Sequence, residues 1–297
     1  MGMGKDLAER FPACREVFQV IDDALGFSLS RLMWEGPEDE LTLTHNAQPA
    51  ILAHSLAVLA LVRPAVNAVA GAGHSLGEYS AYAAADSLSP AEAARLVRKR
   101  GELMLESGRQ RAGTMAAVLG LADDVLARVC SEASRNDSVV VPANLNAPGQ
   151  TVISGDPDAV GRAAALCKVA GAKRVLPLKV SGAFHSPLMM PARRGLEDVL
   201  ARAAFADPSF PVIANATTEP VDSAERGRTL LGEQLTSPVR WSACVRKAVE
   251  FAGPDVTFVE LGPGSVLTGL VKRIDPDARR LTCGTVEEVE SMMEMVA

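Results

Sequence analysis

One glycine-flanked serine constrains this chain more than any other feature. Ser75 lies between Gly73 and Gly77 in a G-x-S-x-G pattern, with an apolar run at residues 64–72 before it and an alanine-rich run at 79–85 after it. The first run predicts a buried strand and the second a helix. A sharp turn between them pushes the hydroxyl outward, and the helix N-terminus offers free N–H groups to negative charge. The stretch therefore predicts a serine nucleophile, with a helix-capping serine as the simpler alternative.

The composition favours helices packed on a parallel sheet. Of the 297 residues, 48% are hydrophobic and only 4% are aromatic, so alanine, valine and leucine must build the core. This suits an α/β protein, and the length suggests about two domains.

Charge and hydropathy exclude other classes of protein. The net charge of −6 argues against nucleic-acid binding. No apolar run is expected to reach transmembrane length and no signal peptide opens the chain, which predicts a cytoplasmic protein without a membrane partner. The cysteines lack C-x-x-C spacing, so we expect neither disulfides nor a zinc site; they are Cys14, Cys130, Cys167, Cys244 and Cys283.

The middle of the chain predicts a small unit of its own. We expect strands at residues 114–119, 139–144, 150–154 and 174–180, with helices at 123–133 and 158–170. This βαββαβ order is the ferredoxin-like motif. Because α/β patterning resumes afterwards, we expect a ferredoxin-like small subdomain at 113–185. It is inserted into an α/β large subdomain with a mostly parallel sheet, at 1–112 and 186–297.

The large subdomain is expected to be rich in helices. Ser89-Pro90-Ala91-Glu92 is a capping-box signature that begins a helix reaching about residue 107. Further apolar periodicity predicts helices at 5–25, 50–61, 191–203, 229–235, 242–251 and 266–274, and strands at 210–214 and 256–261.

A serine nucleophile needs a base, and the chain has only four histidines. His54 falls in an apolar helix, which suits a core residue better than a ligand. His74 adjoins the serine, so we expect it to support the turn or contact substrate. His185 lies on a glycine-containing turn at the seam between the two subdomains, where it could face Ser75 across a cleft. We therefore favour His185 as the base, against the alternative of an ordinary loop histidine.

An α/β-hydrolase is the first rival interpretation. That fold orders its catalytic residues as serine, acid and histidine, with the histidine usually late in the chain. Here no histidine follows His185, although more than 100 residues remain. The order favours a different serine acyl-transfer fold.

Motifs of one kind of enzyme are spread along the chain: Gly73-His74-Ser75-Leu76-Gly77-Glu78, Gln48-Pro49-Ala50, Arg98-Lys99-Arg100-Gly101, residues 144–150, Gly182-Ala183-Phe184-His185, residues 234–241 and Gly262-Pro263-Gly264. With these motifs, nearly the whole chain resembles the malonyl-CoA:acyl-carrier-protein transacylases and the acyltransferase domains of polyketide synthases. The resemblance implies an α/β-hydrolase-like fold for the large subdomain.

The resemblance implies roles for single residues. Ser75 is acylated, and His185 is the base and then the acid for the leaving thiol. A backbone carbonyl at the position of Gln234 orients the histidine ring. Arg100 pairs bidentately with the malonyl carboxylate, for which its planar fork is suited. Gln48 lines the pocket.

The resemblance also implies the substrates. Leu76 and Phe184 look like the malonyl-selecting residues, because members that take methylmalonyl tend to carry glutamine and serine there. Since one methyl group is worth about 1–3 kcal/mol, we expect preference rather than exclusion. The expected partners are malonyl-CoA and an acyl carrier protein, with no cofactor or metal, on a monomer. Four basic residues could meet an acidic carrier or be ordinary solvated charge: Lys173, Arg174, Arg193 and Arg194.

One part of the family pattern has no counterpart in this sequence. Family members begin with an apolar strand and a Gly-Gln-Gly-Ser-Gln loop, whereas Met1-Gly2-Met3-Gly4 matches the stretch just after that loop. The resemblance then implies an oxyanion hole in which the Leu76 N–H remains as one donor, and losing a donor costs about 10²–10³ in rate. The expectation is a start codon assigned too late, or a weakened or inactive form.

Three functions follow as hypotheses. The first is malonyl transfer from coenzyme A to a carrier protein through a Ser75 ester, by a ping-pong route. The second is a serine hydrolase or thioesterase acting on short acyl thioesters. The third is an N-terminally truncated, inactive paralogue that only docks a carrier protein.

Overall fold

The computed structural model describes residues 1–253 and 255–296. Its N-terminal part is helical, and the first strand, β1, is very short. The elements are α1 (Lys5–Arg10), α2 (Pro12–Leu25), α3 (Leu29–Glu35), α4 (Glu38–Leu41), α5 (Thr44–Val62), a 3-10 turn η1 (Arg63–Ala65), β1 (Gly71–Ala72), α6 (Gly77–Ala84) and α7 (Pro90–Gln110).

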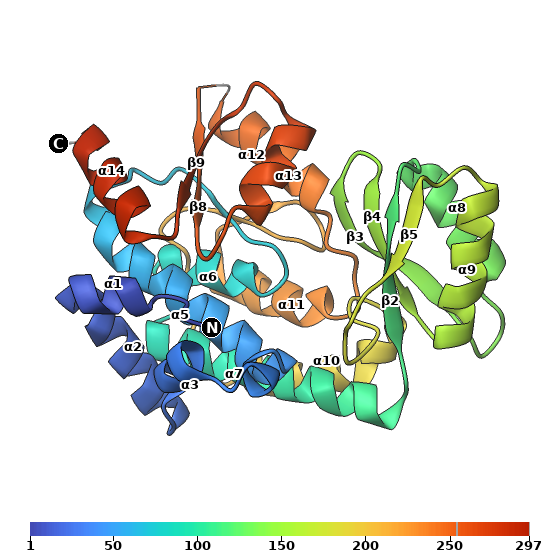
Figure 1. Ribbon diagram of the computed structural model, residues 1–297, viewed down its shortest axis with the longest axis horizontal. Coiled ribbons are helices and arrows are strands. Elements are labelled where there is room, and N and C mark those ends of the chain that lie inside the picture. Colours follow the sequence, from blue (N-terminus) through green and yellow to red (C-terminus); the bar gives the residue numbers. More distant parts are fainter. Residues whose placement is uncertain (254, 297) are drawn as a thin grey trace.

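An antiparallel four-stranded sheet lies with α8 and α9 at the right of Figure 1, drawn in green to yellow. Its strands pair in the order β3-β4-β2-β5, the order of a ferredoxin-like fold. One face of the sheet is covered by α8 and α9, which share an apolar cluster with it. The elements are β2 (Thr114–Leu119), α8 (Asp123–Ala133), β3 (Val140–Ala147), β4 (Gln150–Gly155), α9 (Pro157–Val169) and β5 (Arg174–Pro177).

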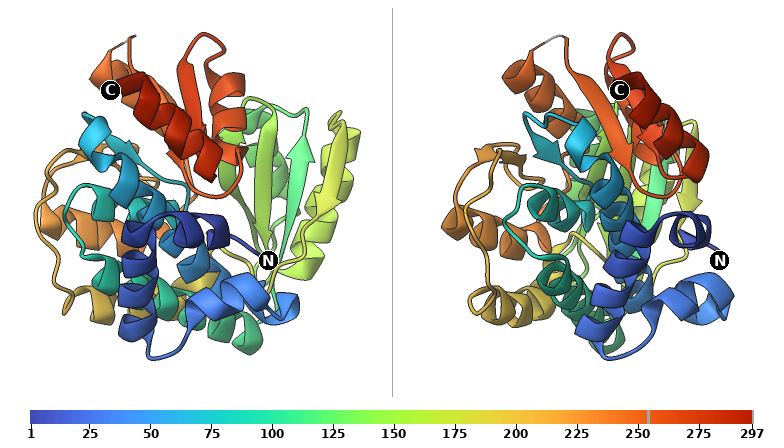
Figure 2. Two further views of the ribbon diagram at one scale, coloured as in Figure 1. Left: turned by 60° about the vertical axis from the view of Figure 1, so that its left-hand side comes forward. Right: turned by 90° about the vertical axis from the view of Figure 1, so that its left-hand side faces the viewer.

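The chain then returns to the helical part. It forms η2 (Pro187–Met189), α10 (Met190–Leu200), β6 (Val212–Ile213), β7 (Pro220–Val221), α11 (Ala224–Gln234), α12 (Trp241–Ala252), β8 (Thr257–Leu261), α13 (Val266–Ile274), β9 (Arg279–Cys283) and α14 (Val286–Val296). Arg10 of α1 pairs with Glu290 of α14 at 2.9 Å, so the first and last helices lie side by side (Figure 2).

The fold class predicted from the sequence is confirmed, with a difference in the parallel sheet. Among the strands of the described residues, parallel pairing joins β1 with β6 and, separately, β8 with β9, while β7 is antiparallel to β6. The strand predicted at residues 64–72 is largely wrong. Only Gly71 and Ala72 pair, and Val69 is 44% exposed. An apolar run becomes a strand only where a neighbouring strand accepts its backbone hydrogen bonds.

Helix boundaries follow local chemistry. Ser89 caps α7 by accepting from the Glu92 N–H at 3.2 Å, as the capping signature predicts. The single helix predicted at 5–25 is wrong. It breaks at Phe11, whose extended backbone precedes Pro12 at the start of α2. Gly26, at φ 73°, ends α2.

The central helix α5 corrects another expectation. Together with η1 it gives a 22-residue helical segment that is long and apolar enough to cross a membrane by length and composition. However, 61% of its most apolar window is buried inside the protein, where α5 packs against α2 and α7. Those contacts explain the hydropathy as that of a core helix.

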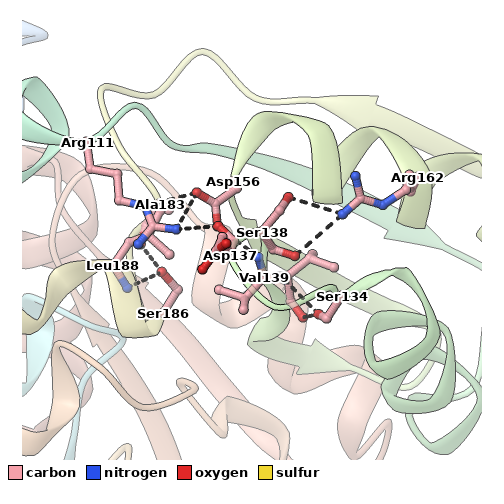
Figure 3. Close-up of polar contacts among 11 residues, drawn as sticks. Arg111, Ser134, Asp137, Ser138, Val139, Asp156, Arg162, Ala183, Ser186 and Leu188 are labelled. Carbon is pink, nitrogen blue, oxygen red and sulfur yellow. Dashed lines mark hydrogen bonds and ion pairs between the residues drawn. The ribbon is translucent and has the colours of Figure 1, made fainter.

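The crossing from α7 into the four-stranded sheet is fixed by an ion pair. Arg111, just after α7, donates to Asp156 Oδ1 at 2.8 Å and to the carbonyl of Asp137 at 3.0 Å (Figure 3). Asp156 Oδ2 also accepts from the Val139 N–H at 2.8 Å.

All five cysteines are free and buried.

Candidate active site

Ser75 lies on the turn between β1 and α6. Its backbone is left-handed, with φ 53°, so it is one of the few non-glycine residues with positive φ. A Cβ on Gly73 would overlap the carbonyl of Gly77, so only glycine fits at that position. The turn thus has the geometry of a nucleophile elbow, with the serine at the start of a helix.

His185 lies in the loop between β5 and η2, and its side chain contacts Ser75. Its Nε2 lies 2.8 Å from Ser75 Oγ, and its Nδ1 lies 2.9 Å from the Gln234 carbonyl oxygen. A carbonyl only accepts, so in the neutral ring Nδ1 carries the hydrogen and Nε2 accepts from the serine hydroxyl. No carboxylate among the described residues contacts this ring, unlike the serine–acid–histidine arrangement of the hydrolases.

The turn that carries His185 is closed by its neighbours. Ser186 Oγ donates to the Ala183 carbonyl at 2.6 Å and accepts from the Leu188 N–H at 3.3 Å (Figure 3). His185 itself has φ 58°. Burial, aided by the positive charge of Arg100, lowers the pKa of His185 to about 3. The ring is therefore neutral at physiological pH and ready to accept a proton.

Arg100 enters the site from α7 and is only 1% exposed. One terminal nitrogen donates to Gln48 Oε1 at 2.5 Å, and the other to Ser75 Oγ at 2.8 Å and Gln234 Oε1 at 2.9 Å. No carboxylate of the described residues lies within ion-pair distance of it. Burial lowers the pKa of its guanidinium. A buried cation whose neighbours are neutral amides and a hydroxyl is suited to bind an anion beside the serine.

The other predicted site residues surround this centre. Gln48 also donates to Thr44 Oγ1 at 2.8 Å within α5. His74 Nε2 lies 2.8 Å from Asn146 Oδ1 on β3. Leu76 takes the N-cap position of α6, where its N–H has no acceptor in the helix. Phe184 packs on apolar side chains of both the helical part and the four-stranded sheet.

Two residues at the site were not predicted. Asn215, two residues after the end of β6, accepts from the Ser75 N–H and donates to the Gly73 carbonyl, both at 2.8 Å. Glu78, in the first turn of α6, accepts from the Asn215 N–H at 3.0 Å. A polar residue at the carboxyl end of a parallel strand is a signal that could have pointed to Asn215.

No cluster of metal-ligating side chains occurs in the part of the chain that the structure describes. The residues brought together are instead a serine, a histidine, an arginine and three amides. Their arrangement can activate a hydroxyl and hold an anionic group beside it.

Comparison with known proteins identifies the enzyme family to which this chain belongs. Residues 1–283 match the family model described as acyl transferase domain. Among curated proteins, the malonyl CoA-acyl carrier protein transacylase of Bacillus subtilis is 43% identical over 98% of this chain and 91% of its own length. The Escherichia coli K12 transacylase is 42% identical over 98% and 93%. The chain belongs to the malonyl CoA-acyl carrier protein transacylase family.

Solved structures agree with this assignment. An acyl carrier protein S-malonyltransferase from Vibrio cholerae superposes with a TM-score of 0.94 at 39% identity, covering 98% of this chain and 95% of its own. A malonyl-transacylase solved in complex with its type II PKS acyl-carrier protein gives a TM-score of 0.95 at 40% identity, covering 99% and 95%.

Proposed function

We propose that this chain transfers a malonyl group from malonyl-CoA to the phosphopantetheine thiol of an acyl carrier protein. The relatives named above support the reaction. The observation that carries it is the buried Arg100 guanidinium, which lies 2.8 Å from the Ser75 hydroxyl and has no carboxylate partner among the described residues. A malonyl thioester bears a free carboxylate that this guanidinium can pair with while the serine attacks the thioester carbonyl.

The first half-reaction loads the enzyme. His185 Nε2 takes the hydroxyl proton as Ser75 Oγ bonds to the thioester carbonyl carbon, which gives a tetrahedral oxyanion. The carbon–sulfur bond then breaks, the coenzyme A thiolate takes the proton from His185, and a malonyl-Ser75 ester remains. The carbonyl of Gln234 holds Nδ1–H through both steps, so the ring keeps one orientation.

The second half-reaction reverses these steps with a different thiol. The carrier protein's thiol gives its proton to His185 and attacks the ester carbonyl, and the serine leaves with that proton. Chemistry at one site in both directions gives a ping-pong mechanism.

The remaining site residues are proposed to bind and select the acyl group. The Leu76 N–H, at the start of α6, is a donor for the oxyanion. Gln48 and Gln234 hold Arg100 in place through its two terminal nitrogens. His74 supports the serine turn, and Leu76 with Phe184 limits the space for an α-methyl group. Selection against methylmalonyl is then worth about 1–3 kcal/mol.

We also propose the domain division and setting. Residues 113–185 form the small unit, and 1–112 with 186–297 form the large one. The separate apolar cluster of the small unit supports this division. The protein acts as a monomer in the cytoplasm.

Intact-mass analysis after mixing with malonyl-CoA tests the proposal. A malonyl adduct should form, disappear in Ser75→Ala, and discharge when a phosphopantetheinylated carrier protein is added. Release of free malonate without an adduct would instead identify a hydrolase. Carrier binding without any acylation would identify a docking protein.

A further inference from the structure

The side-chain amide of Gln234 has only one orientation that satisfies its neighbours. Its Oε1 accepts from Arg100 at 2.9 Å, while its Nε2 donates to the Ser75 carbonyl at 3.0 Å and to Glu78 Oε2 at 2.8 Å. A guanidinium has no acceptor, so a rotated amide would place its NH₂ group against the donors of Arg100. The orientation of this amide therefore decides whether Arg100 has an acceptor beside the serine.

Glu78 supplies the shortest of the three contacts that fix the amide nitrogen; the others are the Ser75 carbonyl at 3.0 Å and Asn215 Oδ1 at 3.5 Å. Its side chain is fully buried in the first turn of α6, and Oε2 accepts from both Gln234 Nε2 and the Asn215 N–H. The Ser75 carbonyl is backbone and cannot be varied. No hydrogen bond joins Glu78 to Ser75 Oγ or His185 among the described residues, so it takes no part in proton transfer.

The charge state of Glu78 does not alter this contact. Burial raises its pKa to about 7, against the opposing effects of its hydrogen bonds and of Arg100. Ionised or neutral, the carboxyl group keeps Oε2 as an acceptor. A side-chain amide at this position offers a carbonyl oxygen in the same way.

We propose that Glu78 is a positioning residue that fixes the Gln234 side-chain amide and, through it, the placement of the Arg100 guanidinium. This inference rests on the proposed function, since Arg100 is the group that receives the malonyl carboxylate. Loss of Glu78 should then reduce use of malonyl-CoA more than use of acetyl-CoA, which has no carboxylate. A residue that only stabilised the fold would reduce both equally.

The test compares kcat/KM for malonyl-CoA and acetyl-CoA in matched variants. Glu78→Met keeps the length of the side chain but removes the acceptor, and should lower the malonyl-to-acetyl ratio by about tenfold or more. Glu78→Gln keeps an acceptor and should retain the ratio of the wild type. Tyr82→Phe serves as the control, because Tyr82 is buried in the same helix and its hydroxyl has no hydrogen-bond partner in the part of the chain that the structure describes.

A double-mutant cycle tests the path through Gln234. Gln234→Met breaks the same hydrogen bond from its other end and keeps the backbone carbonyl that holds His185. It should lower the ratio at least as much, and adding Glu78→Met to it should lower the ratio no further. Gln234→Met also carries the test if Glu78→Met does not fold.

Three outcomes would overturn the inference. An unchanged malonyl-to-acetyl ratio in folded Glu78→Met, or in Gln234→Met, shows that Glu78 does not place Arg100 through the amide. If the decreases in the malonyl-to-acetyl ratio add up in the double variant, Glu78 acts by another route. A decrease of that ratio in Glu78→Gln would show the same. A wild-type chain with no preference for malonyl would overturn the proposed function as well, whereas the first three results leave it standing.

Discussion

Ser75 and His185 share a left-handed backbone and a 2.8 Å hydrogen bond, although 110 residues separate them. Non-glycine residues at positive φ cost about 1–3 kcal/mol each and persist only where the surrounding structure holds them. Asn215 and Gln234 hold the serine at its N–H and its carbonyl, and Ser186 closes the turn at the histidine. The site therefore depends on its supporting hydrogen bonds as much as on the two reactive groups.

Alanine at Gly73 should destabilise the folded protein, whereas alanine at Gly77 should not. Gly73→Ala places a Cβ against the Gly77 carbonyl, whereas the Cβ of Gly77→Ala meets none of the described residues within 4 Å. We expect Gly73→Ala to lower the free energy of unfolding by about 3 kcal/mol or more, and Gly77→Ala to change it by less than about 1 kcal/mol. Urea denaturation measures both. Equal losses would contradict the close approach at Gly73.

Removing the guanidinium should separate malonyl from acetyl substrates. Arg100→Met should lower kcat/KM for malonyl-CoA by about 10²-fold or more, since it deletes a buried charge partner. Acetyl-CoA should lose much less. Lys99→Ala removes an exposed charge next to it in α7 and is the control. A parallel fall for both substrates would show that Arg100 does not bind the carboxylate.

The same variant should change the response to acid. His185 must be neutral to act as a base, and the nearby charge of Arg100 helps to lower its pKa to about 3. Without that charge the pKa rises, although burial still lowers it, so protonation begins at a higher pH. Acylation by acetyl-CoA at about pH 5, relative to pH 7.5, should therefore fall in Arg100→Met more than in the wild type. Identical single-turnover profiles would refute this coupling.

Stability should depend on pH through Glu78. Its pKa in the folded protein is about 7, above the ordinary value of 4.5, so the folded chain retains a proton that the unfolded chain releases. The stability linked to this proton is complete below pH 4.5 and is lost as pH rises through 7.

Glu78→Gln cannot ionise, so it should gain stability relative to the wild type between about pH 5 and pH 8. The relative gain is on the order of 2–3 kcal/mol. Thermal unfolding across that range measures it. A difference in Tm that stays constant with pH would show that Glu78 has no raised pKa.

Phe184 should control the size of the acyl group. Phe184 precedes His185 in the chain and packs on apolar side chains of the helical part and of the four-stranded sheet, so Phe184→Ser should open space for a methyl group. The ratio of methylmalonyl to malonyl transfer should rise about tenfold. Phe251→Ser, at an exposed phenylalanine on α12, is the matched control, and a rise there as well would count against a local effect.

The sequence predicted that His185 could face Ser75 because each residue carries a local or compositional signal, and in the structure the two side chains are in contact. Ser75 has flanking glycines, and His185 is the one histidine on a seam between two patterned regions. The strands and helices of the small sheet were also predicted closely, since β2 and α8 have the bounds expected from periodicity. Those elements depend on local alternation and on their own apolar cluster.

Other features had no local signal. Residues 64–72 are apolar, but most of them have no strand to pair with, so the expected strand shrinks to Gly71 and Ala72. The final elements β9 and α14 were not predicted at all. Glu78 looks like an ordinary acidic residue in the first turn of a helix. Its role depends on Gln234, 156 residues away, and such partnerships exist only once the chain is folded.

Gln234 forms hydrogen bonds to two site residues, one through its backbone and one through its side chain. Its main-chain oxygen holds His185, and its side chain holds Arg100. A side-chain substitution at Gln234 removes the contact with Arg100. It keeps the backbone carbonyl that accepts from His185, unless the backbone itself moves. A mild phenotype at this position would measure the amide alone. Replacing the peptide bond after Gln234 by an ester would weaken its carbonyl as a hydrogen-bond acceptor. The loss of activity in such a protein would measure how much the carbonyl contributes to orienting His185.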